Sequence, residues 1–257
     1  MISSISNEKI KNVVHLRKSA KARRIQECFL VEGPRMFFEI PVSLLREVYV
    51  TEEFSRKYAD RLKGYSYELI TEKVCCHLSD TKTPQGVVAV VGRRNCSLED
   101  MTGRDGKACI IVLENLQDPG NMGTVMRTAE AAGVTGIIMN KGTVDPYNPK
   151  VIRSTMGAVF RIPFLETEDL AADIGFLKER GIAVYAAHLE GDVFYHCDFS
   201  RPCAFLVGNE GNGLTRETAS LADFKIRIPM EGSIESLNAG VAASLLMYEA
   251  LRQRRWS

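Results

Sequence analysis

Residues 108–140 read ACIIVLENLQDPGNMGTVMRTAEAAGVTGIIMN, and this stretch decides the fold class. It predicts a buried strand, a polar turn, a helix that ends at Gly133, and a second buried strand. Further along, LAADIGFLKERG and IAVYAAHL repeat the helix and the strand, and the apolar runs CAFLV and FKIRI follow them. This alternation is typical of an α/β protein whose mostly parallel sheet is covered by helices on both faces.

Outward from this stretch, the chain divides into two expected domains. Residues 1–92 alternate short apolar runs with helical segments and predict a smaller α/β domain. The polar stretch RRNCSLEDMTGRDGK, residues 93–107, is the expected linker, and residues 108–257 form the larger domain, which ends in a long helix over SLNAGVAASLLMYEALRQRR. The charge supports this boundary, because residues 1–100 contain 17 Lys and Arg against 13 Asp and Glu, whereas the remainder contains 16 against 19.

The excess of positive charge is concentrated in residues 7–24, NEKIKNVVHLRKSAKARR, which contain seven basic residues and one acidic residue. Their spacing predicts one amphipathic helix with the basic side chains mostly on the outer face. Such a face can bind the phosphates of a nucleic acid, and it is equally typical of an ordinary solvated helix. Charge alone does not decide between these two interpretations.

The composition excludes several classes of protein. No run of eighteen apolar residues is present, and the N-terminal sequence lacks the apolar core of a signal peptide, so we expect no membrane association. The seven cysteines include no CxxC pair, and the four histidines form no cluster with ligand spacing, so we expect no metal site. An odd number of cysteines in mostly apolar surroundings favours reduced thiols in a cytoplasmic protein.

Three polar loops follow apolar strands, at the edge of an open α/β sheet where ligands bind. The first, ENLQDPGNMGTVMR, ends in Arg127, although a capped turn with a surface arginine has the same pattern. The second, LVGNEGNGL at 206–214, matches neither phosphate-binding fingerprint, and its glycines indicate close approach of the backbone to a ligand or to another segment. The third, IPMEGSIESLNAG at 228–240, offers Ser236 and Asn238 either as helix caps or as pocket groups.

Together the three loops resemble, in order and spacing, the signature motifs of the SpoU family of RNA ribose 2′-O-methyltransferases in the SPOUT superfamily. The matching residues are Asn121-x-Gly123-x-x-x-Arg127-Thr128-Ala129, then Leu206-Val207-Gly208-Asn209-Glu210-Gly211-x-Gly213, then Ile228-Pro229-Met230-x-Gly232-x-x-x-Ser236-Leu237-Asn238-x-x-x-Ala242. The resemblance covers residues 108–252. Residues 1–92 are more loosely similar to the L30e-like RNA-binding domain of many members, through the basic helix, FLVEGPR and TPQGVVAVV.

The resemblance implies a catalytic domain whose C-terminal part is threaded as a trefoil knot. Unaided reasoning from the chain predicts an ordinary doubly wound fold, because knots are nearly absent from proteins. It also implies a homodimer that binds S-adenosylmethionine. The residues implied at the cofactor are Leu206, Gly208, Ile228, Met230 and Leu237. The residues implied at the RNA are Lys9, Lys11, Arg17, Lys18, Lys21, Arg23, Arg24 and Arg35.

The implied reaction is attack of a ribose 2′-hydroxyl on a sulfonium methyl group, which needs alignment of the two groups and removal of a proton. The resemblance assigns Arg127 to this step, either as the base or as a group that holds phosphate and stabilises the developing alkoxide. It further implies that Asn121 and Asn238 position groups, that Ser236 lines the pocket and that Glu210 orients Arg127.

Two alternatives remain at this point. The substrate is either large-subunit ribosomal RNA, which the additional front domain favours, or transfer RNA. The other alternative is an RNA-binding protein without activity, which the three intact motifs argue against.

Overall fold

The computed structural model describes residues 1–102 and 107–256, and the chain forms two compact units. The first unit contains Met1–Arg94 together with Asp145–Phe160, and the second contains Asn95–Val144 and the chain from Arg161 onward. Within the expected linker, Leu98–Met101 form a short helix, α6, that begins at a capping box made by Ser97 and Asp100. Residues 103–106 of that linker lie outside the described residues.

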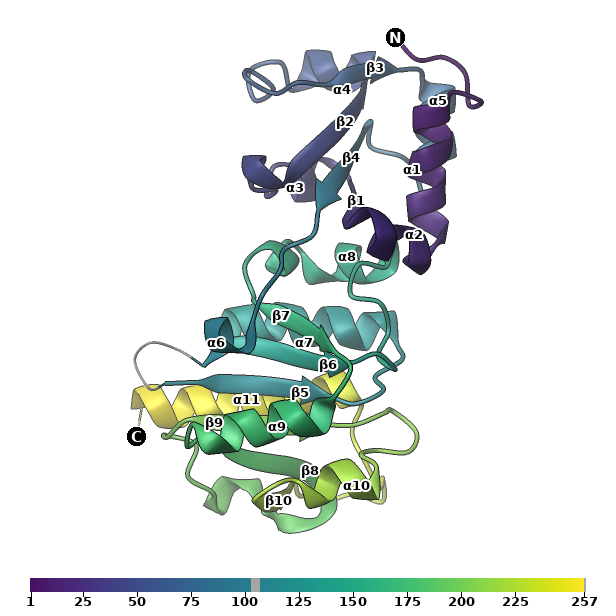
Figure 1. The fold of residues 1–257 in the computed structure, drawn as a ribbon. Coiled ribbons are helices and arrows are strands. Elements are labelled where there is room, and N and C mark those ends of the chain that lie inside the picture. The colour runs from purple at the N-terminus through teal and green to yellow at the C-terminus, as the bar shows by residue number, and fades with distance from the viewer. Residues whose placement is uncertain (103–106, 257) are drawn as a thin grey trace. The chain divides into compact units, whose positions relative to one another are not determined.

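The first unit is built on a four-stranded sheet in the order β1-β4-β2-β3 (Figure 1). The strands are β1 (Cys28–Glu32), β2 (Leu45–Thr51), β3 (Glu68–Ile70) and β4 (Val87–Gly92). Strand β4 runs antiparallel to both of its neighbours, and β3 runs parallel to β2. The helices of residues 1–94 are α1 (Glu8–Lys18), α2 (Ala20–Gln26), α3 (Pro34–Phe37), the 3-10 helix η1 (Val42–Leu44), α4 (Glu52–Lys57) and α5 (Glu72–Leu78).

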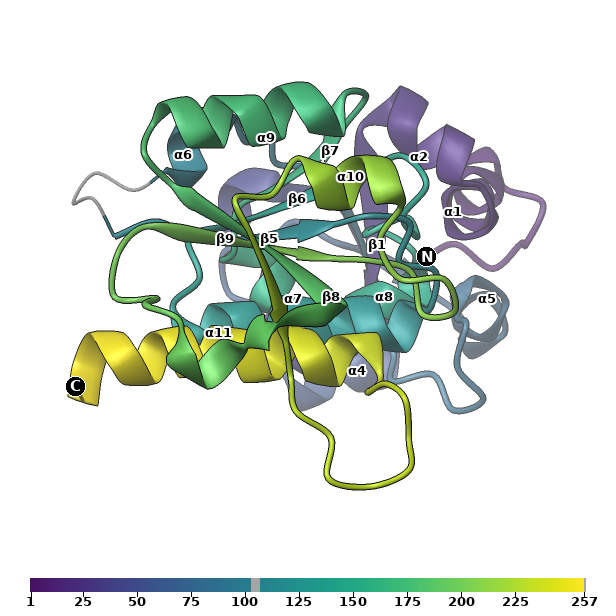
Figure 2. The same ribbon diagram turned by 90° about the horizontal axis from the view of Figure 1, so that it is seen from below.

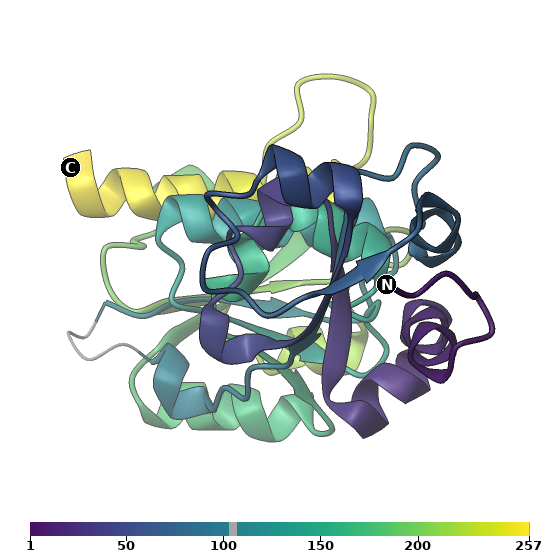
Figure 3. The same ribbon diagram turned by 90° about the horizontal axis from the view of Figure 1, so that it is seen from above.

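The single basic helix predicted over residues 7–24 is wrong, because the chain turns between α1 and α2 (Figure 3). The turn is at Ser19, whose backbone is extended with φ −120° and ψ 112° and whose side chain accepts a hydrogen bond from the Ala22 N–H. Serine is a preferred N-cap because its hydroxyl satisfies an N–H that the first helical turn leaves unpaired. The periodicity of charged and apolar residues did not reveal this cap.

Residues 145–160 pack in the first unit, although they come from within the expected larger domain, residues 108–257. They contain α8 (Pro149–Thr155) and the short 3-10 helix η2 (Ala158–Phe160). The ring of Phe29 on β1 lies 4.6 Å from the ring of Tyr147 and 6.2 Å from that of Phe160, between centroids. The first unit is therefore discontinuous in sequence.

The second unit contains a six-stranded sheet in the order β10-β8-β9-β5-β6-β7, in which every neighbouring pair is parallel. The strands are β5 (Cys109–Leu113), β6 (Gly136–Asn140), β7 (Phe164–Thr167), β8 (Ala183–Val193), β9 (Cys203–Val207) and β10 (Phe224–Arg227). The helices besides α6 are α7 (Pro119–Ala132), α9 (Leu170–Glu179), η3 (Phe194–His196), α10 (Arg216–Ser220) and α11 (Ala239–Trp256). The predicted α/β fold with a parallel sheet is confirmed.

Helices cover both faces of this sheet (Figure 2). Helices α7 and α11 lie on one face, and α6, α9 and α10 lie on the other. Ile110 and Val112 of the central strand β5 contribute to a buried cluster with Ile174 and Leu177 of α9. Within the described residues, no helix combines the length and apolar character needed to cross a membrane.

Candidate functional site

The first two polar loops meet at the carboxyl edge of the second sheet because they follow neighbouring strands. Leu113 at the end of β5 pairs in register with Val207 at the end of β9. The loop after β5 leads into α7, and the loop after β9 leads into α10. Parallel strands bring their carboxyl ends to one edge, so the sheet itself places these loops together.

The first loop ends in a well-defined helix start. Asp118 is the N-cap of α7, and its carboxylate accepts a hydrogen bond from the Asn121 N–H at 2.8 Å. Pro119 occupies the first helical position, where its missing N–H is not needed. The side chain of Asn121 is buried, with 7% exposed, and it turns inward from the first turn of the helix.

The second loop folds back on itself through its glycines. Asn209 and Gly213 exchange two backbone hydrogen bonds, of 3.0 and 2.9 Å. A Cβ atom at Gly208 would lie 2.1 Å from the carbonyl carbon of Gly213, and Gly213 itself has φ +66°. The loop needs glycine at both positions for these reasons, so the glycines serve a close approach between two segments of the backbone.

Glu210, at the tip of this loop, bonds to the first loop. Its carboxylate accepts hydrogen bonds from the N–H groups of Gln117 and Asp118, at 3.0 and 2.9 Å, and from Nδ2 of Asn121 at 2.9 Å. Partial burial alone would raise the pKa of Glu210, but these hydrogen bonds outweigh it and the pKa is lowered. The expected contact between Glu210 and Arg127 is not formed; the carboxylate instead binds these three donors of the first loop.

The third loop reaches the same point through Asn238. Its Nδ2 donates to Oδ1 of Asn121 at 2.8 Å, and its Oδ1 accepts from the Val241 N–H, as an N-cap does. A Cβ atom at Gly240 would lie 3.4 Å from the backbone of Asn121, which shows how closely α11 approaches α7. Glu210, Asn121 and Asn238 therefore form one hydrogen-bonded chain that joins all three loops.

The other predicted catalytic residues lie outside this chain of hydrogen bonds. Arg127 is exposed on α7, and none of the described residues forms a hydrogen bond or ion pair with its guanidinium. Ser236 is exposed in the third loop and does not begin the terminal helix, which starts at Ala239. The sequence analysis predicted that this helix starts at Ser236, and in the structure it starts three residues later, at Ala239.

The predicted cofactor residues come from two kinds of environment. Leu206 and Gly208 are buried at the end of β9. Ile228, Met230 and Leu237 are half-buried in the loop between β10 and α11, which extends away from the sheet in Figure 2. Strand β10 leads into one end of this long loop, and the hydrogen bonds of Asn238 hold the other end.

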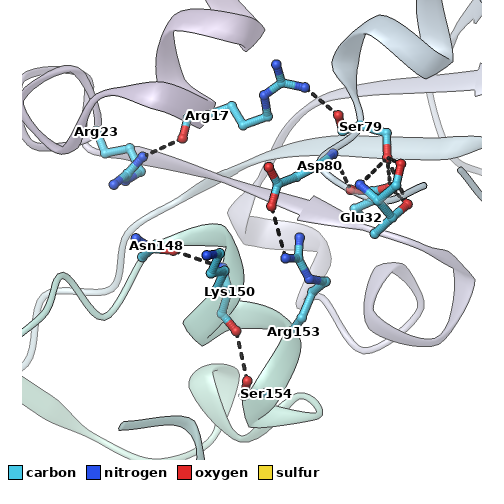
Figure 4. Close-up of polar contacts among 10 residues, drawn as sticks. Arg17, Arg23, Glu32, Ser79, Asp80, Asn148, Lys150, Arg153 and Ser154 are labelled. Carbon is cyan, nitrogen blue, oxygen red and sulfur yellow. Dashed lines mark hydrogen bonds and ion pairs between the residues drawn. The ribbon is translucent and has the colours of Figure 1, made fainter. Parts of the chain in front are cut away.

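The basic side chains predicted to bind RNA lie in the first unit, and several have structural partners (Figure 4). Arg23 is 4% exposed; its Nε donates to Asp145 at 2.8 Å and its Nη1 to the Leu16 carbonyl at 2.6 Å. Figure 4 shows the bond from Arg23 to the Arg17 carbonyl. Arg17 donates to the carbonyls of His77 and Ser79. Arg23 therefore does not belong to the predicted RNA surface, since a buried, paired guanidinium has no free donor for a phosphate.

The remaining basic residues of this set are exposed. Lys9 pairs with Glu68, which raises the pKa of Lys9 chiefly through their hydrogen bond, and Lys11 pairs with Glu8 at 2.7 Å. Such pairs on the surface exchange readily with solvent and with other anions. The other exposed members are Lys18, Lys21, Arg24 and Arg35.

Sequence reasoning missed several polar residues beneath the loops. Asn115, with φ +55°, exchanges hydrogen bonds with the Asn140 side chain, and its carbonyl accepts from Nδ2 of Asn209 at 2.8 Å. Glu114 is buried and binds Thr215 and Thr218. The position of Glu114 and Asn115 directly after the apolar strand could have indicated this role. Polar side chains at such positions are expected to form hydrogen bonds with the backbone of neighbouring loops.

Comparisons with known proteins agree with this geometry. Residues 108–248 match the model of the SpoU rRNA Methylase family, and residues 7–89 match the MRM3-like substrate binding domain. The chain is 32% identical over 250 residues to the 23S rRNA (guanosine(2553)-2′-O)-methyltransferase RlmP of Bacillus subtilis, with 96% of this chain and 97% of that protein covered.

Two solved structures complete the comparison. The AdoMet-bound rRNA methyltransferase of Sinorhizobium meliloti superposes with a TM-score of 0.85 at 30% identity, covering 100% of this chain and 98% of that one. The TrmH/SpoU tRNA modifying enzyme of A. aeolicus superposes with a TM-score of 0.53 at 29% identity. That match covers 61% of this chain and 80% of the other.

Proposed function

The chain belongs to the SpoU rRNA Methylase family, and we propose that it transfers a methyl group from S-adenosylmethionine to a ribose 2′-hydroxyl of large-subunit ribosomal RNA. The observation that carries this proposal is the hydrogen-bonded chain of Glu210, Asn121 and Asn238 at one edge of the sheet. It brings the three motifs into one site, as a single reaction centre requires.

The residues at this edge fit the proposed cofactor. Residues 228–230 and Leu237 are apolar and half-buried, which suits an adenine ring and an aliphatic chain, and the glycine loop exposes main-chain groups at residues 211–213. The ionised Glu210 suits a ligand with positive charge. When bound, S-adenosylmethionine supplies a methyl group on a sulfonium that leaves readily.

Arg127 is the residue that we assign to the transfer step. Its guanidinium is exposed and unpaired among the described residues, so it is available to an RNA phosphate and to the oxygen that gains negative charge. Arginine does not readily give up its proton, so we propose the stabilising role and not that of a base. Asn121 and Asn238 position the loops, and Ser236 lines the pocket.

Ribosomal RNA is the favoured substrate because of the first unit. The full-length similarity is to rRNA methyltransferases, whereas the tRNA modifying enzyme matches about three fifths of the chain. We propose that residues 1–92, completed by residues 145–160, bind RNA through the exposed Lys9, Lys11, Lys18, Lys21, Arg24 and Arg35. Phosphate contacts of this kind give salt-sensitive affinity with little dependence on sequence.

The family resemblance also carries two further proposals. We propose that the segment from β9 to α11 is threaded as a trefoil knot. We also propose that the protein acts in the cytoplasm, where its seven cysteines, all free thiols in the structure, stay reduced.

Binding and transfer experiments test the function. Calorimetry with EDTA present should show S-adenosylmethionine binding, and ribosomal RNA should gain a 2′-O-methyl group that mapping locates. Arg127→Ala should fold and bind the cofactor within about twofold of the wild type, yet lose transfer by about a hundredfold or more, as when a transition-state donor is removed. Absence of cofactor binding at millimolar concentration would refute the proposal.

We propose that the enzyme is a homodimer formed through α11. Sequence reasoning pointed to Ala239, Gly240, Ala242, Ala243, Leu245 and Leu246. In the structure Ala239, Gly240, Ala243 and Leu246 are buried within the subunit, whereas Val241, Leu245 and Tyr248 are 45%, 38% and 49% exposed. The spacing of these three exposed residues places them on one helix face, and an apolar surface stripe is typical of an interface.

Light scattering tests the dimer. At micromolar concentration the wild-type protein should have twice the mass of one chain. The double variant Leu245→Glu, Tyr248→Glu should have the mass of a single chain, because a charged residue is costly in an apolar interface. The matched control is Ala171→Glu, which adds a negative charge at an exposed position of α9, on the opposite face of the sheet from α11. A monomeric wild type contradicts this proposal.

A further inference from the structure

Glu114 is a buried carboxylate at the carboxyl edge of the second sheet. It directly follows β5, and 6% of it is exposed. Its carboxylate accepts hydrogen bonds from the Thr215 N–H at 2.7 Å, from the Thr215 hydroxyl at 2.8 Å and from the Thr218 hydroxyl. All three donors belong to the start of α10.

Hydrogen bonds alone compensate the burial of this carboxylate. None of the described lysines and arginines forms a salt bridge with it. A buried carboxylate without a cation is stable only while its hydrogen bonds are intact, and each bond to a charged acceptor is stronger than a neutral one. The arrangement therefore strongly favours one position of Thr215 relative to β5.

The backbone of Glu114 holds the other end of the same loop. Its N–H donates to the Val207 carbonyl at 2.9 Å. Val207 directly precedes the glycine loop at 208–214, and Thr215 directly follows it. One residue thus fixes both ends of the loop, and the next residue, Asn115, accepts from Nδ2 of Asn209 inside it.

We infer that Glu114 is a positioning residue that sets the shape of the glycine loop for the cofactor. This inference rests on the proposed function, since it takes the loop at 208–214 as part of the S-adenosylmethionine site. Within the loop, Asn209 bonds to the Gly213 backbone and to the N–H groups of Gly211 and Asn212. Residues outside the loop at 208–214, chiefly Glu114 and Asn115, also set its geometry through their hydrogen bonds.

The test compares two buried glutamates of the same unit. Glu114→Gln keeps the shape of the side chain but removes the charge and directs an amide N–H₂ toward donors. Its matched control is Glu249→Gln; Glu249 is 7% exposed on α11 and accepts from Arg252 and Gln253. For each protein we would measure the KM for S-adenosylmethionine, kcat at saturation, the affinity for the demethylated product, and the melting temperature.

We expect Glu114→Gln to raise the KM for S-adenosylmethionine, and to weaken product binding, by about tenfold or more, which corresponds to one lost charge-assisted hydrogen bond. The kcat at saturating cofactor should stay within about twofold. Glu249→Gln should change neither constant, although both variants lose stability. Loss of folded protein alone lowers the apparent kcat and leaves KM unchanged, so the two effects separate.

Substitutions at Thr218 keep the test decisive if Glu114→Gln does not fold. Thr218→Val removes one donor without changing the shape and should raise KM, and Thr218→Ser should restore it. Unchanged KM in Glu114→Gln, or in Thr218→Val where the former does not fold, overturns the inference while the function stands. A wild-type protein that binds no cofactor overturns the proposed function and the inference together.

Discussion

Asn121 is the residue on which the candidate site depends. Its side-chain amide donates to Glu210 and accepts from Asn238, so one residue on α7 bonds to both other loops. Only a carboxamide offers a donor and an acceptor side by side in this way. Aspartate would place a second carboxylate against Glu210, and leucine would remove the hydrogen bonds to both Glu210 and Asn238.

The pKa of Glu210 predicts how this contact depends on pH. Because the pKa of Glu210 is lowered in the folded protein, its stabilisation is present above the usual glutamate pKa and is lost as the pH falls through the lowered value. The melting temperature of the wild type should therefore exceed that of Glu210→Gln at pH 7. This difference should begin to shrink as the pH falls below about 4, near the usual glutamate pKa, and should disappear only below the lowered pKa.

Calorimetric scans from pH 7 to pH 3 measure this difference. Glu217→Gln on α10 is the control, since Glu217 is exposed and its side chain holds no loop. A gap between wild type and Glu210→Gln that stays constant down to pH 3 would show that the carboxylate does not hold the first loop.

At the scale of single residues, the sequence predicted which side chains belong to the site better than it predicted their partners. Asn121, Glu210 and Asn238 were all named from the motifs, and the structure brings them together. Glu210 was expected beside Arg127, however, and Arg23 was expected at the surface. Partners depend on the register of strands distant in sequence, such as Leu113 with Val207, which no local pattern contains.

At the scale of elements, the ion pair of Arg23 and Asp145 joins α2 to the segment that contains α8. Side-chain exposure is 4% for Arg23 and 14% for Asp145, so removal of one partner leaves a largely buried charge without compensation. Arg23→Ala should therefore destabilise the first unit by about 3 kcal/mol. Lys21→Ala, at an exposed position of the same helix, should change stability by less than about 0.5 kcal/mol.

Urea unfolding monitored by circular dichroism measures the free energy of unfolding of both variants. An RNA-binding assay then distinguishes a residue that stabilises the first unit from one that binds RNA. Lys21→Ala should weaken RNA affinity in a salt-dependent manner while the fold is unchanged. If Arg23→Ala instead unfolds like the wild type and loses RNA affinity, then Arg23 belongs to the RNA surface after all.

The elements show where periodicity is informative and where it is not. Most strands and helices of the parallel sheet were predicted because a buried strand needs an apolar run and a covering helix needs an apolar stripe. The short edge strand β7 and the short helix α10 were not predicted. The break at Ser19 and the start of α11 at Ala239 were missed. Both depend on single capping groups, which change the chain direction without changing the pattern of apolar residues.

At the scale of the whole molecule, the first unit depends on residues 145–160. Val151 and Ile152 of this segment are almost fully buried, and so are Tyr147 and Phe160. Removal of residues 1–94 should expose these side chains, so the fragment should aggregate and bind a hydrophobic dye. The simple truncation suggested by the sequence boundary would therefore lose more than RNA binding.

Polar substitutions at Tyr147, Ile152 and Phe160 give the matched control for this truncation. The substituted fragment should stay dispersed in size-exclusion chromatography and bind S-adenosylmethionine within about threefold of the full chain. An unsubstituted fragment that is already dispersed and does not bind the dye would show that residues 145–160 do not depend on the first unit.

The discontinuity of the first unit has a consequence for synthesis on the ribosome. Arg23 emerges early, but its partner Asp145 follows 122 residues later. At translation speeds of about 5–20 residues per second, Arg23 waits roughly 6–24 seconds for its counter-ion. The nascent sheet of β1 to β4 is therefore complete in hydrogen bonds while the face that receives Tyr147 and Phe160 is still bare. The N-terminal part of this protein is made first, yet it finishes folding only after residues 95–144 of the second unit have been translated.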